Sequence, residues 1–299
     1  MTSTRLASSV DYDKNGKQIG WLSLPHSITR SAYGNIMLPI CVIKNGSGPT
    51  ALLTAGNHGD EYEGQIALNK LIRALDPAQV QGRIIIMPAK NMPACLAGTR
   101  VSPIDDKNMN RVFPGDPDGT PTEQIAHYVD SVVFPLADVF ADFHSGGGSL
   151  DFTPYCGFNT TTGVPAGVLE KSLELARVID APYTVNFGED LDTRVSAISA
   201  LRRGLPKIGG EYGGGGSVAV EGIRIVERGI SRLLGHLGIL GDPPKDAPTT
   251  RLLSVPGPDH FVQAPEPGLF EPYVELGETV EPGQPAGQVV FVDNPAREP

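Results

Sequence analysis

Three short, mostly apolar segments constrain the fold of this 299-residue chain more than any other feature. They are ALLTA (51–55), RIIIMP (83–88) and DVFADF (138–143), and stretches with helical spacing of apolar residues separate them. A strand that is apolar on both faces has to be covered on both faces. Strands that alternate with helices therefore predict an α/β fold, in which helices flank a parallel or mixed central sheet.

The helical segments are marked by apolar periodicity and, in one case, by a capping pattern. Thr120, Pro121 and Glu123 form a potential capping box, which predicts that a helix begins there and runs to about residue 134. Further helices are expected at 66–75, 165–179, 193–203 and 217–238. Residues 89–119 instead have little periodicity and are rich in Asn, Asp, Pro and Gly, which indicates a long functional loop.

The texture of the chain changes after GDPPKDAPTT (241–250), whose composition is typical of a linker. We expect residues 1–245 to form the α/β domain, with 1–45 as its β-rich N-terminal segment. Residues 246–299 consist of short apolar runs broken by Pro-Gly pairs, which predicts a small β-rich C-terminal unit. The loop-like ending NPAREP leaves open that this unit is incomplete.

Charge and hydropathy narrow the classes of partner. The formal net charge is -10 and the sequence pI is about 5.1, so we expect no nucleic acid partner. The sequence contains no stretch of about 18 apolar residues, so we expect no membrane partner. The N-terminal segment lacks the apolar core of a signal peptide, which favours a cytoplasmic location. A homo-oligomer is compatible with all of these features.

Polar motifs follow three of the predicted strands, where ligand sites of open α/β sheets gather. His58 and Glu61 come directly after the first strand, in the segment GNHGDE (56–61). An imidazole and a carboxylate one helical turn apart suit a zinc ion. The pattern is short, however, and a surface histidine followed by the acidic start of a helix would look the same.

His144 directly follows the apolar strand that ends at Phe143, and glycines follow it in turn. This placement predicts that the imidazole faces a cleft, where it would be a third metal ligand and leave one coordination position for water. Asp142 points to the same face of the strand as His144. It either orients that imidazole or has a structural role.

Glu211 ends a third strand-like segment, LPKIGGEY (205–212), and lies among glycines. A carboxylate at this position can take a proton from a metal-activated water and pass it to a leaving amine. The alternative is an acidic turn residue in a glycine-rich loop. The long loop adds Arg100 and Arg111, which suit a substrate carboxylate or a developing oxyanion, unless they are solvated loop arginines.

Four of these segments together resemble the succinylglutamate desuccinylase/aspartoacylase family, which is related to zinc carboxypeptidases. They occur in the family's order and the match spans about residues 45–240; the segments are GNHGDEYEG (56–64), NMNRVFPGDPDG (108–119), DFHSGG (142–147) and GGEYG (209–213). The resemblance implies a zinc-carboxypeptidase-like fold with a mixed central sheet. It also implies that residues 1–245 form a zinc hydrolase domain.

The resemblance also implies roles for individual side chains. One zinc ion per chain would be bound by His58, Glu61 and His144, and Glu211 would be the general base and acid. Asn110 and Arg111 would hold the substrate's carboxylate, and Arg100 would polarise the scissile carbonyl. The substrate would be a small N-acyl amino acid. The form of residues 100–127 resembles a longer bacterial branch, which includes the N-acetyl-diaminobutyrate deacetylases of ectoine breakdown.

Two other functions remain open at this stage. A zinc carboxypeptidase acting on a peptide or a peptidoglycan fragment would use the same metal ligands and the same glutamate. A non-catalytic binding or carrier protein is the second alternative, because LGETVEPGQPAG (276–287) has the texture of lipoyl-carrier folds. No lysine follows Lys245, however, so the C-terminal unit has no side chain for lipoyl or biotinyl attachment.

Overall fold

The computed structural model describes residues 4–188, 192–242, 245–255 and 257–298. The chain forms two compact units, Met1–Ser254 and Val255–Pro299. Within the described ranges, no helix is both long enough and apolar enough to cross a membrane. The division into domains at residue 245 stays a prediction.

A ten-stranded sheet is the centre of the first unit in the part of the chain that the structure describes, with the strand order β1-β2-β3-β5-β4-β6-β9-β7-β8-β10. The strands are β1 (Ala7–Ser8), β2 (Gly16–Pro25), β3 (Asn35–Asn45), β4 (Thr50–Ala55), β5 (Gly82–Met87), β6 (Val139–His144), β7 (Tyr155–Asn159), β8 (Tyr183–Phe187), β9 (Lys207–Glu211) and β10 (Arg251–Val255). The four strands β5, β4, β6 and β9 run parallel, whereas β2–β3, β3–β5 and β9–β7 pair antiparallel. This confirms the predicted mixed α/β sheet.

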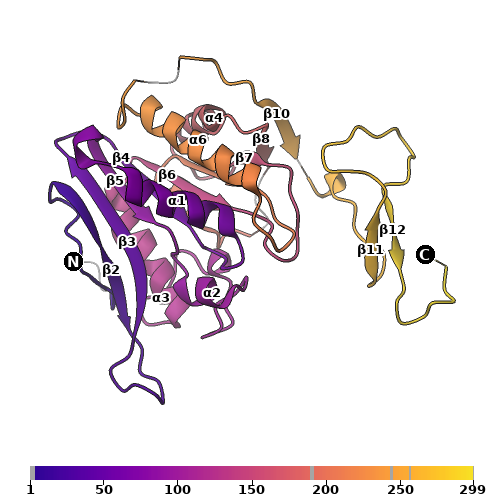
Figure 1. Ribbon diagram of the computed structural model, residues 1–299, viewed down its shortest axis with the longest axis horizontal. Coiled ribbons are helices and arrows are strands. Elements are labelled where there is room, and N and C mark those ends of the chain that lie inside the picture. The colour runs from indigo at the N-terminus through magenta and orange to yellow at the C-terminus, as the bar shows by residue number, and fades with distance from the viewer. Residues whose placement is uncertain (1–3, 189–191, 243–244, 256, 299) are drawn as a thin grey trace. The chain divides into compact units, whose positions relative to one another are not determined.

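Helices cover both faces of the sheet, because its central strands are apolar on both faces. The helices are α1 (Tyr62–Ala74), α2 (Met92–Ala97), α3 (Pro121–Tyr128), α4 (Val168–Ile179), α5 (Ser196–Arg202) and α6 (Val220–His236). Leu53 of β4 packs in one core with α1, α4 and α6, whereas its neighbour Leu52 packs in the other core with α3. Figure 1 shows α1 and α6 lying side by side across the same face. Burying each of these leucines contributes roughly 2 kcal/mol.

Several elements differ from the sequence-based expectations. Strands β7 and β8 were not predicted; they are short, and their end residues are only partly buried. The loop predicted at 89–119 contains the helix α2, which is capped at its C-terminal end by Gly98 with a positive φ of 63°. Thr120 is the N-cap of α3 as predicted, and its N–H donates to Glu123, whereas no partner is found for its hydroxyl among the described residues. The helix α3 ends at Tyr128 and continues as a π-helical turn, η3 (Val129–Val133), and a 3-10 turn, η4 (Phe134–Leu136).

The second unit is small and contains an antiparallel pair of strands, β11 (Leu269–Pro272) and β12 (Gly287–Val290), after a 3-10 turn, η5 (Pro258–His260). Its separate two-stranded sheet agrees with the β-rich texture of the sequence. Strand β10, which also follows the predicted linker, belongs instead to the large sheet.

Candidate active site

The parallel strands β4, β6 and β9 bring the three polar motifs to one edge of the sheet. The strands lie side by side in the order β4-β6-β9, and the register pairs His144 with Glu211 across β6 and β9. His58 and Glu61 follow β4 and precede α1. Because the carboxyl ends of parallel strands meet at the same edge, side chains that are far apart in the sequence converge there.

Glycine at position 59 allows the turn between His58 and Glu61 to approach α2 closely. A Cβ atom at Gly59 would lie 1.9 Å from the carbonyl oxygen of Ala94, so no other residue fits without a shift of the backbone. The N–H of Gly59 donates to the carbonyl of Thr99 over 2.8 Å. The long loop and the helix it contains therefore fix the segment that carries the two side chains.

His58, Glu61 and His144 form a tight cluster. The Nδ1 atoms of His58 and His144 lie 2.5 Å and 2.8 Å from the two carboxylate oxygens of Glu61. One potential ligand atom from each residue lies within 4.8 Å of the others, and all three side chains are nearly buried. Two imidazole nitrogens and a carboxylate oxygen are a donor set that suits zinc, so these residues fit a divalent metal ion.

The charges of this cluster favour an ionised Glu61 beside a protonated His144. Burial opposes ionisation, but His144 and His58 outweigh it and lower the pKa of Glu61 to about 2. Burial also opposes a charged imidazole, but Asp142 and Glu61 outweigh it and raise the pKa of His144 to about 10. Burial lowers the pKa of His58. Of the two imidazoles, His144 therefore carries the positive charge that faces Glu61 in the metal-free cluster.

The second ring nitrogen of His144 is backed by a buried ion pair. Nε2 of His144 lies 3.0 Å from Oδ2 of Asp142, and Nζ of Lys90 lies 2.6 Å from the same oxygen. The hydroxyl of Thr54 donates to the other oxygen of Asp142 over 2.6 Å. Although burial opposes its ionisation, Lys90 and His144 hold the pKa of Asp142 well below its usual range. Asp142 thus orients the imidazole, as carboxylates behind metal-binding histidines do.

The second ring nitrogen of His58 contacts a loop residue, Asn108, instead of a strand residue. Nε2 of His58 lies 3.0 Å from Oδ1 of Asn108, which also accepts a hydrogen bond of 2.8 Å from the backbone N–H of Asn110. Asn108 thereby caps the short turn η2 (Met109–Arg111), which carries Asn110 and Arg111. The turn with the predicted carboxylate-binding residues is therefore tied to the imidazole of His58.

The three predicted loop residues lie in different surroundings. Nη1 of Arg100 lies 3.6 Å from Oε1 of Glu61 and 3.4 Å from Nδ1 of His58, so this guanidinium is at the cluster. Asn110 accepts a hydrogen bond from the backbone N–H of Ser196. Arg111 lies 3.4 Å from the carboxylate of Asp192 and donates to the carbonyl of Asn110.

Glu211 is close to the cluster but is not hydrogen-bonded within it. Its Oε2 atom is buried, and no partner is found for it among the described residues. Burial and the negative charge of Glu61 raise the pKa of Glu211 to about 8, although His144 and Arg100 act in the opposite direction. A carboxylate with an open oxygen and a pKa near neutrality has the properties of a general base.

Two contributors to the site were missed in the sequence. Lys90 follows the strand segment RIIIMP, so its place at the end of a central strand was a usable signal. Its partner could not be identified from the sequence, because Asp142 is 52 residues away and the contact depends on the order of the strands. Asn108 was quoted within its motif, but nothing in the spacing connects it with His58.

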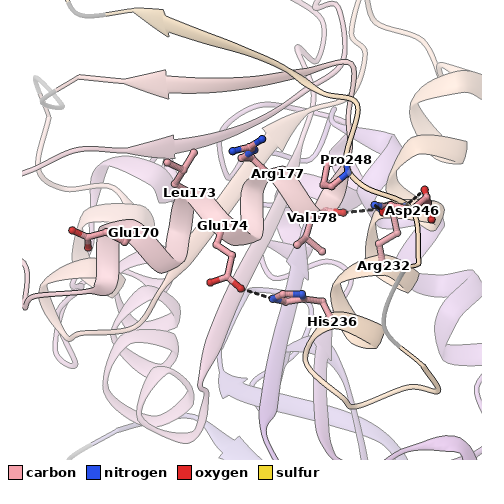
Figure 2. A pocket seen from close by; sticks show the side chains of 9 residues that line it. All are labelled: Glu170, Leu173, Glu174, Arg177, Val178, Arg232, His236, Asp246 and Pro248. Carbon is pink, nitrogen blue, oxygen red and sulfur yellow. Dashed lines mark hydrogen bonds and ion pairs between the residues drawn. The ribbon is translucent and has the colours of Figure 1, made fainter.

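A separate pocket of about 480 Å³ lies along α4 and α6, and none of the residues above lines it. Two ion pairs line it, as Figure 2 shows: His236 lies 2.6 Å from Glu174, and Arg232 lies 2.7 Å from Asp246. Among the described residues, the group of histidines and acids that could hold a metal ion is His58, Glu61 and His144, and the lining of this pocket is not part of it.

Comparisons with known proteins identify the family of the chain. The family model of the succinylglutamate desuccinylase/aspartoacylase catalytic domain matches residues 47–237. The chain is 43% identical to an N-alpha-acetyl-L-2,4-diaminobutyric acid deacetylase from Halomonas elongata over 286 residues, which are 95% of this chain and 83% of that protein.

Two solved structures are similar to the chain in both fold and sequence. One is the product-bound ectoine utilization protein EutE (DoeB) from Ruegeria pomeroyi, with a TM-score of 0.93, 40% identity and coverage of 98% of this chain and 88% of that one. The other is a succinylglutamate desuccinylase/aspartoacylase from Rhodobacter sphaeroides, with a TM-score of 0.91, 43% identity and coverage of 97% and 88%. This chain belongs to the succinylglutamate desuccinylase/aspartoacylase family.

Proposed function

We propose that the protein is a zinc-dependent amidohydrolase that removes the acetyl group from Nα-acetyl-2,4-diaminobutyrate. The observation that carries this proposal is the convergence of His58, Glu61 and His144 at one point, with the open carboxylate of Glu211 beside them. The similarity to a deacetylase of this substrate over nearly the whole chain supports the choice of the acyl amino acid.

His58, Glu61 and His144 would hold one zinc ion per chain, because their ligand atoms already face one another. When bound, the ion acidifies a water molecule and polarises the acyl carbonyl. Asp142 and Asn108 hold the outer nitrogens of the two imidazoles, so both inner Nδ1 atoms are kept facing Glu61. The protein thereby keeps the donor atoms directed toward one another.

Glu211 would perform the proton transfers. Its carboxylate accepts a proton from the attacking water and then donates it to the nitrogen of the scissile amide, so that the C–N bond breaks and acetate and a free amine leave. A carboxyl whose pKa lies near the working pH can do both. The raised pKa of Glu211, about 8, is compatible with this double role.

The cationic loop residues would bind and polarise the substrate. Arg100 is near the cluster and would stabilise the oxyanion that develops on the acyl carbonyl. Arg111 and the amide NH2 group of Asn110 would hold the α-carboxylate of the amino acid. Asp192 lies beside Arg111, so a substrate carboxylate would compete with it for the guanidinium.

Product analysis of the zinc-loaded protein tests the proposal. Incubation with Nα-acetyl-2,4-diaminobutyrate should release acetate and the free diamino acid, and a chelator should abolish the release. N-succinyl and N-formyl amino acids define the acyl preference. Glu211→Gln should lower kcat by about 10²–10⁴-fold while the protein still binds zinc. Release of C-terminal amino acids from dipeptides, without deacetylation, would instead identify a carboxypeptidase.

A further inference from the structure

Two glycine-rich loops lie beyond the strand ends that carry His144 and Glu211, and they are hydrogen-bonded to each other. The first loop covers residues 145–150 and the second covers 212–219. Their backbone hydrogen bonds are Tyr212 N–H to His144 O (3.1 Å), Gly146 N–H to Gly213 O (2.9 Å), Gly215 N–H to Leu150 O (2.8 Å) and Gly216 N–H to Gly147 O (2.8 Å). The pairing of β6 with β9 therefore continues into the loops.

Such loops need further contacts to be well ordered. Gly147, Gly215 and Gly216 have φ between 57° and 71°, and Gly213 and Gly214 have φ near 150°. Glycine in these conformations loses more conformational freedom on folding than any other residue. The pairing of β6 with β9 sets the backbones of His144 and Glu211, and the contacts on the outer sides of the two loops hold the segments that follow them.

Asp60 holds the first loop. Its Oδ2 atom accepts a hydrogen bond of 2.8 Å from the backbone N–H of Gly148. A Cβ atom at Gly147 would lie only 2.4 Å from the same oxygen, so the backbone of the loop lies directly against the carboxylate. Asp60 is the residue before Glu61, and it therefore connects the segment of two proposed ligands with the loop behind the third.

Glu63 holds the second loop in the same way. Its side chain is fully buried, and Oε1 accepts a hydrogen bond of 2.7 Å from the backbone N–H of Ala219, the residue before α6. A Cβ atom at Gly213 would lie 2.9 Å from this oxygen, so Glu63 contacts both ends of the loop. The positive end of the α6 dipole also favours a carboxylate at this place.

We infer that Asp60 and Glu63 are positioning residues that fix the two loops, and with them His144 and Glu211, relative to Glu61. This inference rests on the proposed function. Three acidic residues within four positions then have three tasks: Glu61 faces the imidazoles, Asp60 holds the loop after β6, and Glu63 holds the loop after β9. The start of α1 sets the geometry of the whole site.

Two substitutions at position 63 distinguish the effect of losing the hydrogen bond to Ala219 from the effect of changing the volume of the side chain. Glu63→Leu removes the acceptor but fills the space, so Glu211 should shift and kcat should fall about 10–100-fold, since a displacement of about 1 Å can cost that much. Zinc affinity and KM should change less than about threefold, because the loop after β9 carries no proposed ligand. Glu63→Gln keeps an acceptor for Ala219 and should retain kcat within about threefold.

Substitutions at position 60 should act on the metal instead. Asp60→Ala should weaken Zn²⁺ or Co²⁺ binding by about 10-fold or more, and it should alter the visible absorption of the Co²⁺ protein, because the loop behind His144 is released. Asp60→Asn keeps an acceptor for Gly148 and should bind both ions nearly as the wild type does. Metal affinity is measured by chelator competition and does not require a substrate.

A matched control breaks a different contact between α1 and α6. Glu227 lies 2.7 Å from Lys70 on the exposed side of these helices, so Glu227→Gln loosens the same helix pair without touching the loops. It should change neither kcat nor metal affinity. Equal losses of kcat in Glu63→Gln and Glu63→Leu, or unchanged metal binding in Asp60→Ala, would overturn the inference. A wild-type protein that binds metal but deacetylates no substrate would refute the proposed function alone. The role of Asp60 would still be tested, because the metal affinity of its variants is measured without a substrate.

Discussion

The two imidazoles of the candidate metal site each have their outer nitrogen on an oxygen acceptor, but the acceptors differ in charge and surroundings. On the strand side, His144 contacts Asp142, whose carboxylate is fully buried and paired with the buried ammonium of Lys90. On the loop side, His58 contacts the neutral amide of Asn108, which also caps the turn of Asn110 and Arg111.

Because the two acceptors differ in their surroundings, loss of Asp142's ion pair should mainly affect protein stability, whereas loss of the Asn108 contact should mainly affect the proposed substrate site. The ion pair of Lys90 and Asp142 lies between β4, β5 and β6, so its loss disturbs the core of the sheet as well as His144. The Asn108 contact lies in a loop, so its loss should disturb His58 and the turn of Asn110 and Arg111 while the core remains intact. The strand side thus fixes one imidazole as part of folding, and the loop side links the other to the turn that we propose binds the substrate.

The largest expected effect is on folding, from the strand side. Lys90→Met should lower the free energy of unfolding of the metal-free protein by about 3–5 kcal/mol, because the buried carboxylates of Asp142 and Glu61 then share the single positive charge of His144. Urea denaturation measures this loss. The double variant Lys90→Met/Asp142→Asn removes both charges and should recover most of the stability. A Lys90→Met protein within about 1 kcal/mol of the wild type would show that the pair is not a folding determinant.

The origin of this strand-side pair also shows what the sequence could and could not reveal. The apolar runs of β4, β5 and β6 predicted a covered sheet, and the motifs at the strand ends identified His58, Glu61, His144 and Glu211 as candidates. Each of these signals is local in the sequence. The contact between Lys90 and Asp142 needs the order β5-β4-β6, which no local pattern specifies.

The same reasoning explains the missed strands β7 and β8. Both have only five residues, and neither has an apolar run as long as those of β5 or β6. They are strands because β7 pairs with β9 and β8 pairs with β7 in the folded sheet. Tertiary pairing here outweighs a weak local preference for the strand conformation.

The next largest effect is the pH dependence of zinc affinity, which also arises from the contact of His144 with Asp142. Because Asp142 and Glu61 raise the pKa of His144 to about 10, this imidazole is protonated at pH 8 to 9.5 and must lose its proton when a metal binds. Zinc affinity should therefore rise about tenfold per pH unit in this range, or about 30-fold in all. His58, whose pKa is lowered, is neutral throughout and adds no dependence.

Chelator-buffered zinc titrations between pH 8 and 9.5 measure this dependence. In Asp142→Asn the negative charge behind His144 is gone, so its pKa should fall and the slope should become shallower. A wild-type affinity that does not change with pH would contradict the assignment of the charge to His144. A slope that remains in the Asp142→Asn variant would assign the proton to another group.

The smallest effect is expected on the loop side. Asn108→Ala should weaken zinc binding by about tenfold, because His58 loses the acceptor that orients its ring, whereas stability should fall by only about 1 kcal/mol through loss of the turn cap. Asn108→Asp keeps an oxygen for both partners and should restore affinity. Asn69→Ala, on the exposed side of α1, is the control variant and should leave zinc affinity unchanged.

KM for the acetylated substrate should rise in Asn108→Ala even at saturating zinc, because the same amide holds the turn of Asn110 and Arg111. If zinc affinity fell while KM at saturating zinc stayed at the wild-type value, Asn108 would serve His58 alone, and the loop side would not couple metal and substrate.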